Sequence, residues 1–311
     1  MKIRSLLFKL SGKGDRDLGE LVKGGLFAFG YRVLTMAVSY ALVIFISRKL
    51  GKEGLGVWNL CLAALNILVM LGCLGFNTSI VRFVSEYRAK QWQSLVKELY
   101  RHIIRYAAVG GTLLGFLLIL SSDLLAKYYF KDELMSLPLK ITGIIVPLVV
   151  TSTINVEFIR GHKRIQISEF FRTLILQAVA LIGTAVMSFY SLTFEDPLIF
   201  YSLGALIALI GTTIFIKKLL SDPGSEPREA PPVFSFKTHF LISLPMILTS
   251  FIQLLNGRVD ILMLGYFSDT GVAGVFGLAF KLSIITNFVL GAVKSIAMPK
   301  ISELFWSDKK K

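Results

Sequence analysis

The sequence contains little charge and few of the residue types that most often carry catalysis. Only 17% of its 311 residues are charged, whereas about a quarter are charged in a typical soluble domain. It has two cysteines and three histidines. This composition excludes an ordinary soluble enzyme and a free nucleic-acid-binding protein, and we expect no nucleic acid among its partners.

The cysteines and histidines do not form a pattern typical of a metal or catalytic site. Cys61 and Cys73 are twelve positions apart on one predicted helix, hence about 18 Å apart and beyond the reach of a disulfide. His102, His162 and His239 lie in loops or at helix ends, and none has a second ligand four residues away. We therefore predict no catalytic residue, no metal and no cofactor, and a protein that is not an enzyme.

Long apolar blocks occupy most of the chain. Hydrophobic residues make up 54% of it, and the mean hydropathy is +0.67. Eight blocks have roughly the 17 to 25 residues that a helix needs to cross about 30 Å of hydrocarbon. They are residues 25–47, 54–75, 106–125, 139–159, 173–189, 198–216, 241–263 and 273–298. The sequence predicts an all-α, polytopic membrane protein with about eight transmembrane helices.

The net charge of +14 indicates how the chain is oriented in the membrane. If the amino terminus is cytoplasmic, 24 of the 34 Lys and Arg residues fall on that side and six fall outside, with four inside the helices. Such an excess on short segments follows the positive-inside rule. We expect a multi-pass protein of the cell membrane, in contact with membrane lipids, with both termini cytoplasmic.

A proline-rich, charged run at 221–232 divides the apolar blocks into six and two. Such a run is typical of a semi-rigid linker. We predict four units: a cytoplasmic segment 1–23, a first transmembrane lobe 24–218, a cytoplasmic linker 219–236, and the first two helices of a second lobe at 237–311. Because nothing follows to match helices 3 to 6, we expect the chain to be truncated at its carboxyl end.

The two lobes show traces of a repeat. Residues 56–60 (GVWNL) resemble residues 274–278 (GVFGL), 218 positions later, and residues 84–86 (VSE) resemble residues 301–303 (ISE). Transporters are often built from such repeats, although shared apolar composition is the alternative explanation. Gly271, Gly274 and Gly277 have helical spacing, which favours close packing between helices.

Six ionisable residues lie within or near the ends of the predicted spans. Each costs at least about a few kcal/mol in hydrocarbon unless it faces a wet cavity or a partner. The candidate substrate-binding residues are Arg32, Arg258, Lys281 and Lys294, and the candidate counter-ions or coupling-ion ligands are Asp260 and Glu157. Their sum is positive, which predicts a cationic cavity for an anionic ligand. The alternative is structural, with Glu157 pairing with Arg160 and Lys294 reaching the inner surface.

Several short motifs resemble one family of transporters. They are residues 46–56 (ISRKLGKEGLG), 72–75 (GCLG), 82–86 (RFVSE), 258–265 (RVDILMLG) and 299–302 (PKIS). The chain resembles the polysaccharide or O-antigen flippases of the multidrug/oligosaccharidyl-lipid/polysaccharide exporter superfamily. The resemblance implies a two-lobed helical flippase that moves lipid-linked oligosaccharide across the cytoplasmic membrane by alternating access. In such a protein the basic residues of the cavity would bind the lipid pyrophosphate.

Other functions are open at this stage. Within the superfamily, the alternative is a cation-coupled multidrug exporter, for which we would expect an acidic cavity. The short second lobe also suits a non-transporting remnant or an assembly subunit, with a second polypeptide or protomer supplying the missing helices. A membrane-embedded glycosyl or acyl transferase is the weakest alternative, because His102 and His162 have no obvious acidic partner.

Overall fold

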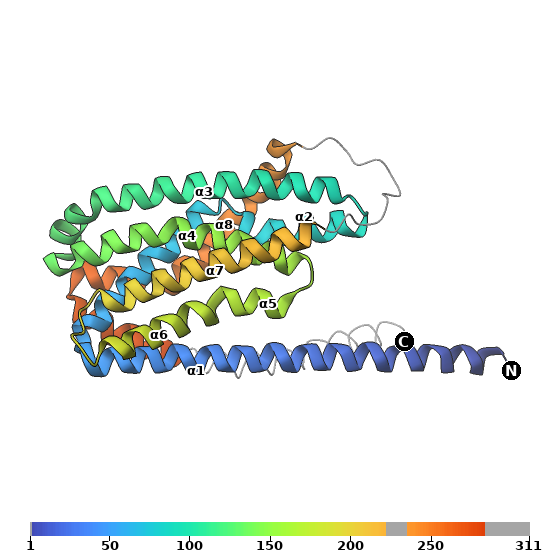
Figure 1. Cartoon of the computed structure of the whole chain (residues 1–311), viewed down its shortest axis with the longest axis horizontal. Coiled ribbons are helices and arrows are strands. Elements are labelled where there is room, and N and C mark those ends of the chain that lie inside the picture. Colours follow the sequence, from blue (N-terminus) through green and yellow to red (C-terminus); the bar gives the residue numbers. More distant parts are fainter. Residues whose placement is uncertain (1, 222–234, 284–311) are drawn as a thin grey trace, which may run out of the picture.

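The computed structural model describes residues 2–221 and 235–283, without the side chains of residues 2–29, 32 and 253–258. Within these ranges the chain forms helices and no strand. The helices lie side by side in an elongated bundle (Figure 1). We name the ends of this bundle by their landmarks: the α2 end carries helix α2 (Phe76–Ala89), and the Gly51 end is the opposite one.

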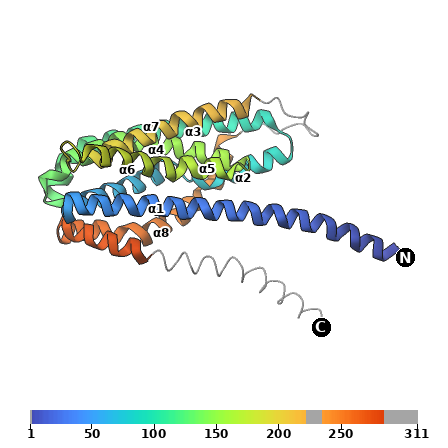
Figure 2. The same ribbon diagram turned by 60° about the horizontal axis from the view of Figure 1, so that its bottom comes forward.

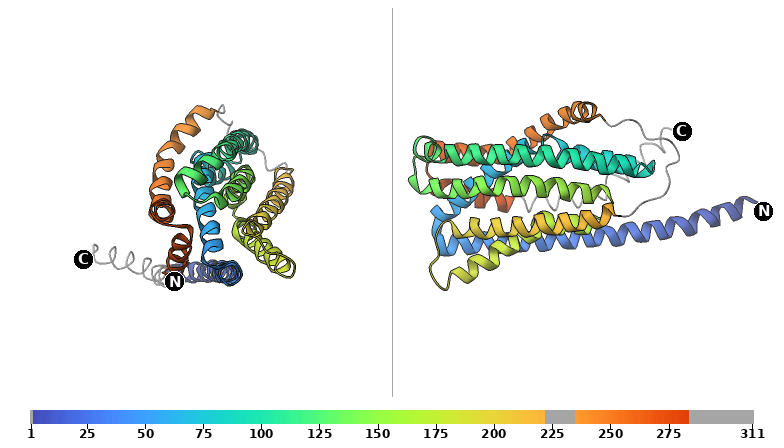
Figure 3. Two further views of the ribbon diagram at one scale, coloured as in Figure 1. Left: turned by 90° about the vertical axis from the view of Figure 1, so that its left-hand side faces the viewer. Right: turned by 45° about the horizontal axis from the view of Figure 1, so that its top comes forward.

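Helix α1 (Lys2–Gly72) consists of two helices joined at Gly51. Gly51 has φ 70° and ψ −167°, a conformation that glycine adopts because it has no Cβ. The chain reverses there, so residues 2–50 run toward the Gly51 end and residues 52–72 run back (Figures 1 and 3). The first two predicted spans therefore form separate passes. The amino-terminal part of α1 extends beyond the bundle at the α2 end (Figure 2).

The rest of the first lobe alternates between the two ends. Its helices are α3 (Gln93–Leu124) with the π-helical turn η1 (Leu125–Phe130), α4 (Ser136–Gly161) after the short turn η2 (Glu133–Met135), α5 (Ile165–Glu169) continued by η3 (Phe170–Leu174) and α6 (Ile175–Met187), and α7 (Asp196–Leu220). The segments that we predicted to be cytoplasmic lie at the α2 end where they are described, and those predicted to be outside lie at the Gly51 end (Figure 1).

Two further helices lie in the segment that we predicted to begin a second lobe, and we keep the names first and second lobe for residues 24–218 and 237–311. Helix α8 (Phe236–Phe267) runs from the α2 end to the Gly51 end, and the Thr270–Ser283 helix returns. Short polar residues begin them: the Ser235 hydroxyl accepts a hydrogen bond from the Thr238 amide, and the Asp269 carboxylate accepts one from the Val272 amide at 2.7 Å. Such caps satisfy amide groups that the helix itself leaves unpaired.

Helix α8 packs antiparallel against residues 52–72 and their continuation, α2. A Cβ on Gly265 would lie 2.6 Å from Leu60 Cδ2, and a Cβ on Gly75 would lie 2.8 Å from the Ser243 carbonyl oxygen. Nearer the α2 end, Tyr87 contacts His239. In the end-on view of Figure 3, residues 52–72 cross the centre with α8 on one side and the first-lobe helices on the other. The described seam between the lobes therefore runs along the length of α8.

The bundle has an apolar outside, as expected of a protein surrounded by lipid. Leu60, Phe76, Ile145 and Phe158 are fully buried in the core. Large apolar side chains on α3, α6, α7 and α8 are exposed by more than half: examples are Val109, Leu120, Ile182, Ile214 and Leu248. In the described ranges 2–221 and 235–283, five helices are long and apolar enough to cross a membrane, and the first of them, residues 33–72, includes the reversal at Gly51. The chain is an all-α, multi-pass membrane protein.

The helices extend beyond the predicted membrane spans. Helix α3 begins at Gln93, ahead of the apolar block that starts at 106, and α2 forms a helix within the segment between spans. The apolar blocks mark only the part of a helix that lies in hydrocarbon, and charged residues such as Lys97 and Arg101 continue the helix beyond it. Helix α1 likewise begins at Lys2, before the apolar block that starts at residue 25.

Candidate substrate-binding site

Lys281 joins the two lobes through contacts with α1. Its ammonium group donates hydrogen bonds to the Ser39 hydroxyl at 2.6 Å and to the Ser39 carbonyl oxygen at 3.1 Å. The ammonium group also lies 5.5 Å from the centre of the Tyr40 ring, whose hydroxyl donates to the Lys281 carbonyl oxygen. The ammonium group of Lys281 thus lies between the lobes, beside the Tyr40 ring.

We expect this contact to lie near the middle of the membrane. Lys281 comes eleven residues after the start of its helix at Thr270, and Tyr40 comes eleven residues before Gly51. At 1.5 Å per residue, both lie about 16 Å from the Gly51 end, roughly half of the 30 Å hydrocarbon core. An ionisable residue at this depth is a candidate functional residue, because its charge is costly there without a purpose.

The side chains of the other predicted basic residues lie outside the described parts of the chain. The backbones of Arg32 in α1 and Arg258 in α8 are described, but their side chains are not. Lys294 lies wholly outside the described residues. Position 32 precedes Ser39 by seven residues, or about two turns of α1. Among the four predicted basic residues, Lys281 is therefore the one whose side-chain contacts the structure describes.

Asp260 and Glu157, the two predicted acidic residues, have different surroundings. Asp260 is exposed on α8, about two turns from the Gly51 end. Glu157 is buried in α4 near the α2 end, with 5% of its surface exposed. The structure does not bring the two together, because they belong to different lobes and opposite halves of the bundle.

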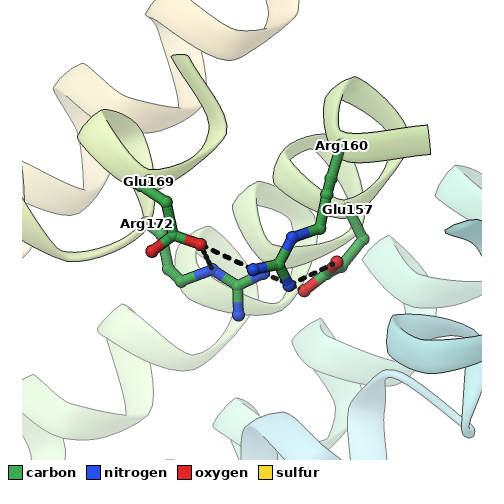
Figure 4. Close-up of polar contacts among 4 residues, drawn as sticks. All are labelled: Glu157, Arg160, Glu169 and Arg172. Carbon is green, nitrogen blue, oxygen red and sulfur yellow. Dashed lines mark hydrogen bonds and ion pairs between the residues drawn. The ribbon is translucent and has the colours of Figure 1, made fainter. Parts of the chain in front are cut away.

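Glu157 belongs to a network of four charged residues at the α2 end (Figure 4). Its carboxylate pairs with Arg172 in η3 and, at 3.5 Å, with Arg160 one turn later in α4. Arg160 also pairs with Glu169 at 2.7 Å. Two carboxylates thus balance two guanidinium groups across the turn between α4 and α5. A carboxylate balanced in this way is a poor ligand for a coupling cation.

A cavity of about 60 Å³ lies beside this network, lined by Arg172, Ser152 and Thr153 with four apolar residues. Its volume suits a few water molecules, which would hydrate the buried Arg172 Nε. It is too small for an oligosaccharide. The charged network links α4 to η3 across the turn between α4 and α5.

His162, at the end of α4, is also unsuited to hold an anion at neutral pH. Burial lowers its pKa to about 4, and the nearby Arg88 charge acts in the same direction. Its Nδ1 lies 3.0 Å from the Phe158 carbonyl oxygen. The ring is therefore uncharged near pH 7. Among the described residues, no group of three or more His, Cys, Asp or Glu side chains could hold a metal.

Some contacting residues had little signal in the sequence. Ser39 and Tyr40 stand as two adjacent polar residues inside an apolar block, which is the trace that could have indicated them. Arg172 lies one residue before a predicted span and counts there only as a cytoplasmic charge. The polar contacts between the lobes at the α2 end, Ser79 with Ser243 at 2.6 Å and Tyr87 with His239, require the fold to be known.

Comparisons with known proteins agree on the family and the fold. A family model described as "Polysaccharide biosynthesis protein" matches residues 21–305. The MATE multidrug transporter DinF-BH, solved in complex with a ligand, is 14% identical with a TM-score of 0.55, over 83% of this chain and 59% of that one. A solved chain described only as "protein A" is also 14% identical, with a TM-score of 0.56 and the same coverage. No curated protein matches.

The two solved chains establish the fold alone, because their identity is low, and this chain spans 59% of their length. The family match covers nearly all of the sequence and includes both lobes. The chain therefore belongs to the polysaccharide biosynthesis protein family, with a fold similar to that of a MATE transporter.

Proposed function

We propose that the protein is a flippase that moves lipid-linked oligosaccharide across the cytoplasmic membrane by alternating access. The observation that carries this proposal is the ammonium group of Lys281, which lies at mid-membrane depth between the two lobes. A cation at that place attracts the pyrophosphate of a lipid carrier, since charge-assisted hydrogen bonds are strong in a low dielectric. The family and the transporter fold support the proposal.

Arg32, Arg258 and Lys294 are proposed to contribute to the same cationic cavity. Asp260 is proposed as a counter-ion or coupling-ion ligand. We propose no catalytic role for any residue, and hence a transporter rather than an enzyme. The proposed partners are the lipid-linked glycan, membrane lipids and a second polypeptide or protomer that supplies further helices.

Translocation can be measured with the protein in lipid vesicles. We expect a fluorescent oligosaccharide on a short prenyl diphosphate to cross vesicles that contain the protein faster than empty ones. The matched control is the same glycan on an uncharged prenyl alcohol, which lacks the anion that Lys281 would bind. Equal rates for the diphosphate with and without protein would contradict the proposal.

A multidrug exporter is the second candidate, because a solved structure with this fold is a multidrug transporter. The same vesicles separate the two functions. An exporter would move a lipophilic cationic dye under an ion gradient and leave the prenyl diphosphate behind. The flippase would show the opposite preference.

For orientation, we propose that the α2 end and both termini are cytoplasmic. Lys163→Cys at the α2 end should then react with a membrane-impermeant maleimide only after the cells are opened. Tyr190→Cys, which is 83% exposed at the Gly51 end, should react in intact cells. Cys61 and Cys73 are buried and give no background. If Lys163→Cys reacted in intact cells and Tyr190→Cys reacted only in opened cells, the chain would have the opposite orientation.

A further inference from the structure

One face of helix α3 is basic near the α2 end and apolar farther along. Arg101 and Arg105 are exposed one turn apart, immediately before the apolar block that starts at residue 106. Spacings of three and four residues connect Arg105 with an open groove on the same face, which has a volume of about 470 Å³. The groove is lined by Ala108, Val109, Thr112, Leu113 and Phe116. We call the two arginines and these five residues the α3 stripe.

The groove is apolar, although a threonine lines it. The Thr112 hydroxyl donates a hydrogen bond to the Ala108 carbonyl oxygen at 2.8 Å, so its donor is satisfied within the helix. Val109, Leu113 and Phe116 are each exposed by more than half. Helix α3 lies at the outer edge of the bundle (Figures 1 and 3). The groove is therefore open to the surrounding hydrocarbon, and an apolar chain suits it.

The α3 stripe has about the length of one membrane leaflet. Phe116 follows Arg105 by eleven residues, which is about 16 Å along the helix. Half of the hydrocarbon core is about 15 Å thick. A phospholipid with its phosphate beside Arg105 would thus extend an acyl chain along the whole groove. The long prenyl chain of a glycan carrier would extend well beyond the end of the groove.

The two arginines are placed to bind an anionic headgroup. In the described part of the chain, neither guanidinium group forms an ion pair. Glu98, a carboxylate on the same face, lies one turn farther from the membrane than Arg101. Guanidinium groups bind phosphate through paired hydrogen bonds, and basic clusters next to membrane helices attract anionic lipids.

Tyr106 marks the boundary between the basic and the apolar part of the stripe. It is 47% exposed, and its ring stacks on the ring of Phe236 with the centroids 4.2 Å apart. Tyrosine is enriched at the level of the lipid headgroups. Because Phe236 begins α8, a lipid on this stripe would lie beside the first turn of the second lobe.

We propose that the α3 stripe binds an anionic phospholipid, with its phosphate at Arg101 and Arg105 and one acyl chain in the groove. This ligand is separate from the transported substrate, because the stripe lies on the outside of the first lobe and Lys281 lies between the lobes. The inference therefore goes beyond the proposed function and does not depend on it.

Photoreactive lipids test the site in the full chain. The protein is placed in phosphatidylcholine vesicles with a trace of phosphatidylglycerol or phosphatidylcholine that carries a diazirine on one acyl chain, and labelled peptides are identified by mass spectrometry. Each arginine contributes about fivefold in affinity for an anionic lipid, so phosphatidylglycerol should label residues 108–116 up to about 30 times more than phosphatidylcholine does. Arg101→Gln/Arg105→Gln should bring this ratio close to one. The matched control, Lys217→Gln/Lys218→Gln, removes two exposed charges from the last turn of α7 at the same end and should leave the ratio unchanged.

A second pair of variants tests the groove without changing the charge. Thr112→Phe fills the groove with an apolar side chain and should lower the labelling of residues 108–116 while both arginines remain. Leu120→Phe alters a position of the same helix that is 62% exposed and lies beyond the groove, and it should have no effect. Both positions are on the surface, so size-exclusion chromatography should show folded protein for each variant.

Three results would overturn the proposal. Equal labelling of the groove by the two lipids would show that the arginines do not select an anion. Labelling by neither lipid would show that protein, such as a second copy of the chain, covers the stripe. Displacement of the phosphatidylglycerol probe by a prenyl diphosphate, but not by unlabelled phosphatidylglycerol, would show that the stripe binds the glycan carrier instead. None of these measurements requires translocation, so they decide the lipid site even if the protein moves no glycan.

Discussion

Replacing Lys281 with methionine is expected to abolish translocation of the lipid-linked glycan while the protein still inserts and folds. Methionine is similar in length and can keep the packing against Tyr40, so the change removes mainly the charge. Hydrogen bonds to charged groups contribute about 1.5–3 kcal/mol, which corresponds to a loss of roughly 10- to 150-fold in substrate affinity. Translocation in lipid vesicles and the yield of folded protein are the two measurements.

The two readouts separate binding from structure. If Lys281 only held the lobes together, an apolar residue of similar volume would be tolerated, as it often is for buried charges. Losing a charge at mid-membrane also makes insertion easier, so the yield should not fall. Lys281→Arg keeps the charge in a different geometry and should retain part of the activity. Lys49→Met, exposed at the Gly51 end, is the matched control. Translocation by Lys281→Met at the wild-type rate would remove Lys281 from the site.

Replacing Glu157 with glutamine is expected to destabilise the protein without changing translocation per folded molecule. The substitution leaves Arg160 and Arg172 without their shared carboxylate. Breaking a fully buried pair costs about 3–5 kcal/mol. Because the two arginine side chains are 33% exposed, solvent screening reduces this to about 1–3 kcal/mol. The shift in thermal unfolding of the detergent-solubilised protein measures the loss.

Glu86→Gln is the control for this change, because Glu86 pairs with Lys90 at the same end but both side chains are more than 40% exposed. We expect only about 0.3–0.5 kcal/mol there. Glu157→Gln combined with Arg172→Gln should lose less stability than the two single changes added together. A coupling-ion role for Glu157 predicts the reverse pattern: translocation lost and stability unchanged.

The glycines show what a sequence pattern can predict about helix packing and what it cannot. The spacing of Gly271, Gly274 and Gly277 predicted close helix packing, and the structure confirms it. The pattern could not say which helix they meet, because spacing describes one face of one helix. The weak similarity between residues 56–60 and 274–278 acquired its physical meaning only when the equivalent glycines were found in contact.

Charged residues illustrate the same limit. Pairing of Glu157 with Arg160, one helical turn away, was the structural alternative to a counter-ion role, and the two residues do pair. Its nearer partner, Arg172, is fifteen residues distant and reaches it through the turn between α4 and α5. The partners of Lys281 lie more than 240 residues earlier in the chain. Local periodicity contains no information about such pairs.

The sequence by itself determined the class of this protein: long apolar blocks require helices in lipid, since every backbone polar group must be satisfied within its own segment. The asymmetry of the basic residues indicated which ends of the helices lie together. Only the tertiary structure decided which faces meet. It placed Lys281 against Ser39 and Tyr40, and Gly56 against Gly274, because contacts between distant segments depend on how whole helices pack and cross.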